Sequence, residues 1–298
     1  MKPVNIGTWH PYNMWIDEEQ KEEQLYHITE TSLDNGLGNV KFIYTKTIDK
    51  MNQYLTDLIK QIKIVDSTKM IMDEVYYTAV IEGAKTTVAI TQELHNGTRL
   101  PKDKSEHMVK NGFDAVKLLN LYGNNLTIEK LINVWNVIVR NCCENEHIRG
   151  ERFRIGNVEV GGFVPVDFNR LEKLMSGFMN FWYSDELSEY PFIKTILLHY
   201  AYETIHPFCD GNGRLGRLLL NNYLVQNGID VARALAFSPE ICKTRLRFDV
   251  AISDSENEYN DCTPFIEYML DTMVNSCLNI LDSNPKVLNS SLPEIDKF

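Results

Sequence analysis

Apolar residues recur at every third or fourth position along most of the chain from Asp66 onward, which is the spacing that lines one face of a helix. This pattern predicts helices over residues 67–83, 105–121, 127–142, 168–183, 191–205, 213–227 and 263–282. It is clearest in the last segment, whose apolar positions run from Ile266 to Leu278. We therefore predict a mainly α protein.

One segment departs from the helical pattern. Residues 153–166 read FRIGNVEVGGFVPV, in which apolar and polar residues alternate and glycine-containing pairs occur at Gly156-Asn157 and Gly161-Gly162. This combination predicts a short β-hairpin or extended flap. A separate turn is expected at Asn35–Asn39, which reads NGLGN.

The length of 298 residues allows one large domain or two smaller ones. We divide the chain into an N-terminal region of mixed pattern (1–65), a helical domain (66–282) and a polar tail (283–298). The role of residues 1–65 is not predicted. Within them begins an amphipathic stretch, 51–64, which we expect to pack on the core or on a second subunit.

The charge balance excludes some classes of partner. The chain has 30 Lys and Arg against 41 Asp and Glu, a net charge of −11. Affinity for nucleic acid or anionic membranes comes from clustered basic side chains, so we expect neither partner. We expect no membrane-spanning helix, because no apolar stretch approaches the roughly 18 residues that one requires.

The cysteine pattern bears on the compartment. The six cysteines show no CxxC spacing and no accompanying histidine pair, which argues against a zinc site or a disulfide scaffold. The N-terminus lacks a basic stretch followed by an apolar one, so no signal peptide is expected. We predict reduced thiols and a cytoplasmic protein.

A twelve-residue segment between two predicted helices concentrates the candidate chemistry. It reads HPFCDGNGRLGR from His206 to Arg217. Its small residues let main-chain N–H groups face one point, and the start of the next helix favours an anion there. Arg214 and Arg217 are three residues apart on one helical face and suit a polyphosphate. Asp210 offers a hard oxygen ligand to Mg²⁺, and His206 can exchange a proton near neutral pH.

Three other motifs fit this segment less well. Asp210 and Asn212 are spaced as in a calcium loop, but Arg214 stands where an oxygen ligand is required. No Gly-Lys-Ser/Thr follows, which excludes a P-loop. Gly211, Gly213 and Gly216 fit G-x-G-x-x-G, but the preceding residues predict a helix where a dinucleotide fold needs a strand.

The same segment resembles the signature of the Fic family, HPFx(D/E)GNGRxxR, and matches it at every defined position. The resemblance extends over residues 66–282. Tyr77–Gly83 is similar to the inhibitory helix of the family, (S/T)xxxE(G/N), and Val158–Phe163 is similar to its flap. Residues 1–65 carry no such resemblance.

The resemblance implies a helical core with a β-hairpin flap and transfer of AMP from ATP to a Ser, Thr or Tyr hydroxyl of a protein. His206 would be the catalytic base, and Asp210 would hold Mg²⁺. The ATP-binding set would be Asp210, Gly211, Asn212, Gly213, Arg214, Gly216, Arg217, Val160, Gly161, Gly162, Phe163 and Phe248. Gly213-Arg214 is kept, which favours AMP transfer over transfer of another phosphate-containing group.

The expected adenine wall departs from the family pattern. Relatives often carry two tyrosines after a Lys-x-Arg stretch, whereas here Lys243–Arg247 leads into Phe248-Asp249, with one aromatic residue. Asn257 is a further candidate for this wall.

The resemblance also implies a regulatory role for Thr78, Glu82 and Gly83. A carboxylate at the C-terminal end of a helix faces the unfavourable end of the dipole and gains from a cationic partner. We hypothesise that Glu82 pairs with Arg217 and prevents the γ-phosphate of ATP from seating.

The sequence thus predicts an autoinhibited, Mg²⁺-dependent protein adenylyltransferase. Removal of AMP, transfer of another phosphate-containing group, and a nucleotide-sensing adaptor or toxin–antitoxin component stay open as alternatives. So do self-modification and a homodimer.

Overall fold

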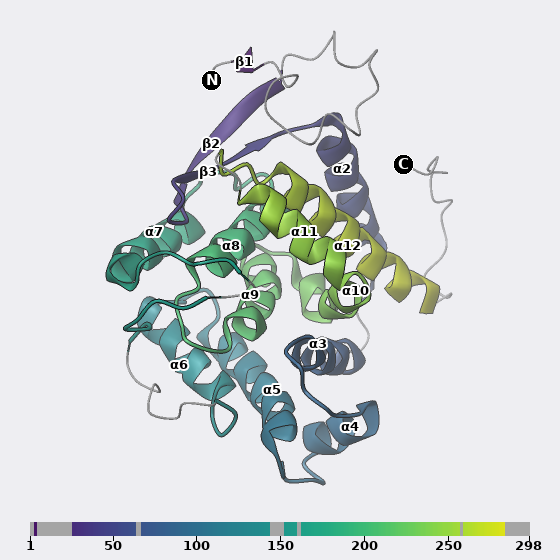
Figure 1. Ribbon diagram of the computed structural model, residues 1–298. Coiled ribbons are helices and arrows are strands. Elements are labelled where there is room, and N and C mark those ends of the chain that lie inside the picture. The colour runs from purple at the N-terminus through teal and green to yellow at the C-terminus, as the bar shows by residue number, and fades with distance from the viewer. Residues whose placement is uncertain are drawn as a thin grey trace.

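The structure, a computed structural model, describes residues 3–4, 26–63, 67–143, 152–159, 162–256 and 259–283. It is mainly α, as predicted (Figure 1). The helices are α2 (Lys46–Gln61), α3 (Thr68–Ile81), α4 (Val88–Asn96), α5 (Lys104–Tyr122), α6 (Ile128–Ile138), α7 (Leu171–Tyr183), α8 (Pro191–Ile205), α9 (Asn212–Gln226), α10 (Ser238–Lys243), α11 (Arg245–Ser255) and α12 (Thr263–Ser283). Two 3₁₀ turns, η4 (Phe168–Arg170) and η5 (Asp230–Ala234), complete the helical part.

Each predicted helix has a counterpart in the structure, and the largest difference in its bounds lies at 127–142. There α6 ends at Ile138. The carbonyl oxygen of Ile138 accepts hydrogen bonds from Asn111 Nδ2 at 3.2 Å and from Arg214 Nη1 at 3.2 Å. Side chains distant in the sequence therefore satisfy the last carbonyl group of this helix. The spacing of apolar residues alone cannot predict where such a helix ends.

The sequence pattern missed α4, α10 and α11. In α11 only Phe248, Ala251 and Ser255 are buried, so this helix has no continuous apolar face. α4 is marked by its ends instead, because Thr87 Oγ1 accepts from the N–H of Ile90 and Gly97 adopts a left-handed φ of 73°. Local capping rather than periodicity identifies such short helices.

A small antiparallel sheet belongs to the N-terminal region. Its strand order is β1 (Pro3–Val4), β2 (Tyr26–Asp34), β3 (Asn39–Ile43). The expected turn joins β2 to β3, with the N–H of Asn35 donating to the carbonyl of Gly38 at 3.3 Å. β2 packs against α7 and β3 against α12.

The predicted hairpin over 153–166 is not formed in its described parts. Residues 152–159 and 162–166 are loop, apart from a single bridge residue at Phe163, and Val160 and Gly161 lie outside the described residues. The alternation was misleading because two of its apolar members, Ile155 and Val164, are 71% and 64% exposed. The small sheet of the protein lies in β1–β3 instead.

α8 is the centre of the core, and nearly all of its residues are buried. It packs against α7, α9 and α12. Leu33 and Phe42 of the sheet and Leu55 of α2 belong to the same buried cluster. The amphipathic stretch predicted at 51–64 falls largely in α2, which packs along α12. The N-terminal region therefore contributes to the core of the helical domain.

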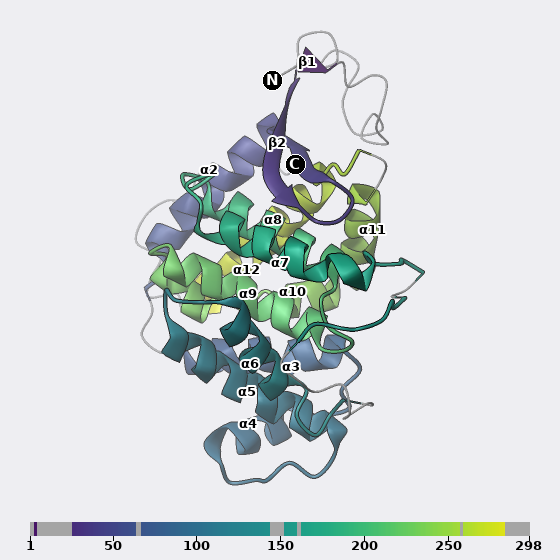
Figure 2. The same cartoon turned by 90° about the vertical axis from the view of Figure 1, so that its left-hand side faces the viewer.

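Helices α8 and α9, which flank the segment from His206 to Arg217, lie between the two ends of the molecule. Figures 1 and 2 place β2 and β3 at one end and α4 with the start of α5 at the other. α3 packs with α4 and α5 around a second buried cluster that includes Val75, Ala79 and Phe113. No helix in the described ranges combines the length and apolar content that crossing a membrane requires.

Candidate active site

The loop between α8 and α9 owes its shape to two left-handed residues. His206 ends α8 with φ 50° and ψ 62°, and Gly211 precedes α9 with φ 79°. Among the described residues, no side chain caps the first turn of α9. The N–H groups of that turn therefore face the same side as the loop, which is an arrangement that binds anions.

Phe208 and Asn212 hold this loop in place. Phe208 is completely buried and stacks on Trp135, with ring centroids 4.4 Å apart and planes 6° from parallel. Asn212 Nδ2 donates to the carbonyl of Phe208 at 2.7 Å, and its Oδ1 accepts from the N–H of Phe208 at 3.0 Å. The side chain of Asn212 is thus occupied within the loop, so its contribution to a ligand would come from its main chain.

Arg214 is fixed by three contacts. Its Nη2 donates to Asp210 Oδ1 at 3.0 Å, and its Nη1 donates to the carbonyl of Ile138 and to Cys142 Sγ at 3.2 and 3.3 Å. The side chain of Arg214 is only 4% exposed. The guanidinium group is therefore oriented before any ligand arrives, which reduces the entropy that binding would cost.

Arg217 makes the contact that the sequence hypothesis expected. Its Nη2 donates to Glu82 Oε1 at 2.6 Å, and its Nε donates to Thr78 Oγ1 at 2.7 Å. Burial opposes ionisation of Glu82, but the charge and hydrogen bond of Arg217 outweigh it and hold the pKa of Glu82 below its ordinary value. α3 ends at Ile81, so Glu82 is its C-cap residue, and Gly83 follows with a φ of 85°.

Gly213 and Gly216 of α9 leave room for the carboxylates of Glu82 and Glu203. A Cβ atom at Gly213 would overlap Glu82 Oε1 and would lie 3.0 Å from Arg217 Nη1. A Cβ atom at Gly216 would lie 2.5 Å from Glu203 Oε1. Gly213, which belongs to the signature, and Gly216, which occupies one of its undefined positions, thus permit the approach of Glu82 and of Glu203 to α9.

His206 has the protonation state that a general base requires. Burial is the main cause that lowers the pKa of its imidazole to about 4, while a hydrogen bond to the main-chain carbonyl of Glu203 opposes the shift. The ring is therefore neutral near pH 7 and can accept a proton from a hydroxyl group.

Arg154 links the loop to the flap segment, and sequence reasoning missed it. It is 4% exposed, and its Nε and Nη1 donate to the carbonyls of His206 at 2.9 Å and Gly156 at 2.8 Å. Its Nη2 donates to the carbonyl of Val166. Nothing in the spacing of a lone arginine indicates this role, because its acceptors are main-chain groups brought together by the fold.

The remaining residues expected to contact the nucleotide lie in the flap segment and in or shortly after α11. Gly162 adopts a left-handed φ of 91° and Phe163 is half-buried, while Val160, Gly161 and Asn257 lie outside the described residues. The adenine contact expected of Phe248 needs correction. Its ring is 5% exposed and packs edge-on against Phe265, so it is part of the core and offers no open face to a base.

Asp210 suits a magnesium ion that takes its remaining ligands from phosphates and water. Its side chain is 32% exposed, and its carboxylate lies beside the start of α9. No group of three or more His, Cys, Asp or Glu side chains able to hold a metal occurs in the described part of the chain. Mg²⁺ is commonly bound by one or two carboxylates together with substrate phosphates, so a single aspartate fits such a site.

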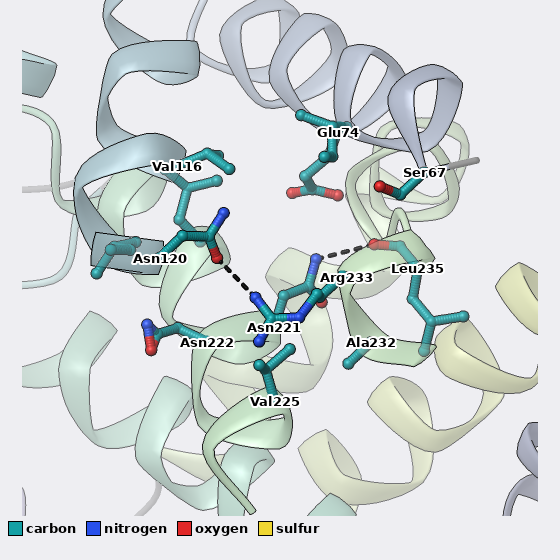
Figure 3. Close-up of a pocket in the computed structure, with 13 residues that line it drawn as sticks. Ser67, Glu74, Val116, Asn120, Asn221, Asn222, Val225, Ala232, Arg233 and Leu235 are labelled. Atoms are coloured by element: carbon teal, nitrogen blue, oxygen red, sulfur yellow. Dashed lines mark hydrogen bonds between the residues drawn. The ribbon is translucent and has the colours of Figure 1, made fainter. Parts of the chain in front are cut away.

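A hollow separates the first half of α3 from α9 (Figure 3). Its cavity volume is about 120 Å³, it is partly open to solvent, and it lies between α3, α5, α9 and η5. Figure 3 shows Asn120 bonded to Arg233 and Asn221 bonded to Leu235 on its floor. Glu74 of α3 lies on its wall. The first half of α3 thus lies across a gap from α9, and the hydrogen bonds that join the two helices come from Thr78 and Glu82.

A model of the Fic/DOC family matches residues 125–224, from just before α6 to the last turn of α9, and this range contains the whole loop. The chain contains a Fic domain. The matched residues include α6, α7, α8 and α9. The signature residues 206–217 form the loop between α8 and α9 and the first turns of α9.

Curated relatives support the assignment. The chain is 27% identical over 244 residues to the protein adenylyltransferase fic-1 of Caenorhabditis elegans, an alignment that covers 75% of this chain and 46% of that protein. It is 29% identical over 297 residues to the protein adenylyltransferase Fic of Nematostella vectensis, covering 89% of this chain and 67% of that protein. The chain therefore spans less than half the length of the nematode relative.

The fold is shared with solved Fic structures. The crystal structure of a Fic family protein from Desulfovibrio desulfuricans superposes with a TM-score of 0.70 at 19% identity, covering 82% of this chain and 77% of that chain. This similarity shows the Fic fold.

Proposed function

We propose that this Fic domain is a protein adenylyltransferase, which moves AMP from ATP to a hydroxyl group of a protein. The observation that carries the proposal is the loop itself: a neutral, half-buried His206 precedes an uncapped helix start that is flanked by the guanidinium groups of Arg214 and Arg217. The activity named for the curated relatives supports the same reaction.

The residues of this chain divide the reaction between them. The hydroxyl oxygen of the target bonds to the α-phosphorus of ATP, and the bond between the α- and β-phosphates breaks. His206 takes the proton of the hydroxyl group, and pyrophosphate leaves. Arg214 and the first N–H groups of α9 hold the β-phosphate side, and Arg217 meets the γ-phosphate. Mg²⁺ bound to Asp210 would neutralise part of the phosphate charge.

Glu82 would regulate this reaction by occupying Arg217. Its carboxylate takes up the guanidinium group that the γ-phosphate needs, and Thr78 adds a second contact to the same side chain. We propose that the domain is autoinhibited until α3 withdraws Glu82, because one guanidinium edge cannot pair fully with both anions.

The target is a protein that presents a Ser, Thr or Tyr hydroxyl group, and the chain itself is included in this class. We place the reaction in the cytoplasm, where the six cysteines of the chain would stay reduced.

The position of the label in ATP tests the reaction type. With the Glu82→Gly protein, we expect ATP labelled at the α-phosphate to label protein and ATP labelled at the γ-phosphate to leave it unlabelled. Label from the γ-phosphate would indicate phosphoryl transfer instead. His206→Ala should abolish the labelling. A protein that binds ATP and transfers neither label would be a nucleotide sensor and would overturn the proposal.

A further inference from the structure

A second carboxyl group lies beside the phosphate-binding helix, and the reaction above does not use it. Glu203 is on α8, three residues before His206, and its side chain is 14% exposed. Its Oε1 is buried and has no hydrogen-bond partner among the described residues. The same holds for both ring nitrogens of His199 and for the hydroxyl oxygen of Tyr202. Buried polar atoms are nearly always paired, so such a cluster requires an explanation.

The two carboxyl groups approach the same helix at successive turns. Glu82 reaches α9 from α3 at Gly213, and Glu203 reaches it from α8 at Gly216. Gly213 and Gly216 are three residues apart and share one face of α9, and Arg217 follows directly. Arg217 therefore contacts Glu82 directly, and Glu203 approaches the residue next to it from α8.

The surroundings of Glu203 set its charge. Burial raises the pKa of Glu203 to about 7, with Arg217 of α9 and Arg245 of α11 opposing the shift and Glu82 of α3 adding to it. His199 lies on α8, the same helix as Glu203. Burial and the charge of Arg217 lower the pKa of His199 to about 3, so its ring is neutral. His199 Nδ1 lies 3.9 Å from Glu203 Oε1, which puts an acceptor close to a proton on Glu203.

We propose that Glu203 is a positioning residue that competes with the terminal phosphate of the nucleotide for Arg217 and releases Arg217 when its carboxyl group takes up a proton. This inference rests on the proposed function. In the protonated state the Glu203 hydroxyl turns to His199 Nδ1, and the charge of Arg217 faces the nucleotide. In the ionised state a negative charge lies beside Arg217 and draws the guanidinium group toward α8.

The sign of the effect follows from the charges. An ionised carboxyl group near a phosphate site weakens anion binding, and bound nucleotide in turn favours the protonated form. A coupling of half to one pKa unit corresponds to roughly 3- to 10-fold in affinity. The effect should be confined to ligands that reach Arg217.

The test compares two nucleotides and three proteins in the Glu82→Gly background, so that Glu82 does not mask Arg217. A non-hydrolysable ATP analogue and ADP are titrated calorimetrically with Mg²⁺ between pH 5.5 and 8.5. The proteins are Glu82→Gly alone, the same with Glu203→Gln, and the same with Glu256→Gln. Glu256 is a matched control, because burial also raises its pKa to about 7 while it lies at the end of α11.

We expect Glu203→Gln to bind the ATP analogue as its parent does at pH 5.5 and roughly 3- to 10-fold more tightly at pH 8.5. The ratio between the two proteins removes the nucleotide's own ionisation. ADP affinity and the Glu256→Gln protein should show no such change. Equal affinities at pH 8.5, or an equal gain for ADP, would overturn the inference.

A second measurement needs no substitution at position 203. Infrared difference spectra of the Glu82→Gly protein at pH 7 should show a protonated carboxyl band that grows when the ATP analogue binds and not when ADP binds. Absence of this growth contradicts the inference. Transfer is scored separately: a protein with the predicted binding profile and no labelling refutes the proposed function alone, whereas one that binds neither nucleotide refutes both.

Discussion

At the scale of the residue, the signature divides into ligands and supports. Asn212 and Phe208 belong to a conspicuous sequence motif, yet their side chains are buried and hold the loop rather than face a ligand. The pairing of Glu82 with Arg217 was predictable, because both positions match known motifs. Arg154 was not, since its acceptors are main-chain carbonyls, and Phe248 was misplaced because Phe265 and Tyr268 cover it from a distant helix.

Asn212→Ala tests the support role. The change leaves the N–H and carbonyl of Phe208 unpaired in a buried loop, so we expect the free energy of unfolding to fall by about 2–4 kcal/mol. Urea denaturation measures this loss. Asn169→Ala, at an exposed position, is the control and should change stability little. An unchanged unfolding free energy for Asn212→Ala would contradict the support role.

His199 should make the protein sensitive to acid. Because burial lowers its pKa to about 3 in the folded state, the unfolded chain takes up the proton first as pH falls. The stability that the neutral ring contributes is complete above about pH 6.5 and is lost as pH falls toward 3. Compared with His199→Gln, the parent should lose about 2–3 kcal/mol between pH 7 and pH 4.5. Parallel stability curves for the two proteins would contradict this assignment.

At the scale of the element, hydrogen bonds of Thr78, Glu82 and Glu74 connect the described part of α3 to α9 and α10. Besides the contacts of Thr78 and Glu82 with Arg217, buried Glu74 accepts hydrogen bonds from the N–H and Oγ of Ser238 at the start of α10, at 2.9 and 2.5 Å. The hollow of Figure 3 separates Ile71 and Glu74, in the first half of α3, from α9. Release of Arg217 in the proposed regulation would require a shift of α3.

Ser238→Ala tests this attachment. It leaves one buried oxygen of Glu74 unpaired, which costs about 1–3 kcal/mol of unfolding free energy, and it should raise basal labelling because α3 is held less firmly. Ser276→Ala is the matched control, since Ser276 of α12 donates a buried hydrogen bond to the carbonyl of Ala236, which the change removes. If both variants raise labelling equally, general destabilisation rather than the attachment of α3 is responsible.

At the scale of the whole molecule, the sequence predicted a boundary near residue 65, where the resemblance to the Fic family begins. The structure adds that residues on both sides of this point share one buried cluster. Helices with an apolar face were predictable because the period of their own sequence records their burial. The packing of β2, β3 and α2 on the Fic domain was not, because it depends on contacts with α7 and α12.

Truncation tests the shared core. A chain that begins at Ser67 loses the buried side chains of Leu33, Phe42 and Leu55 and exposes the faces of α7 and α12 that they cover. We expect it to lack a cooperative thermal transition in circular dichroism. A truncated chain that melts cooperatively near the temperature of the full chain would show that the two parts fold separately.

The contact between Glu82 and Arg217 is the basis of the proposed autoinhibition. The measurement that tests it most directly is the initial rate at which ATP labelled at the α-phosphate labels protein, compared between the unmodified chain and Glu82→Gly. Removal of a charged hydrogen bond of about 1.5–3 kcal/mol predicts an increase of roughly ten- to a hundred-fold, and His206→Ala should abolish it. Equal rates for the unmodified and Glu82→Gly proteins would contradict the account.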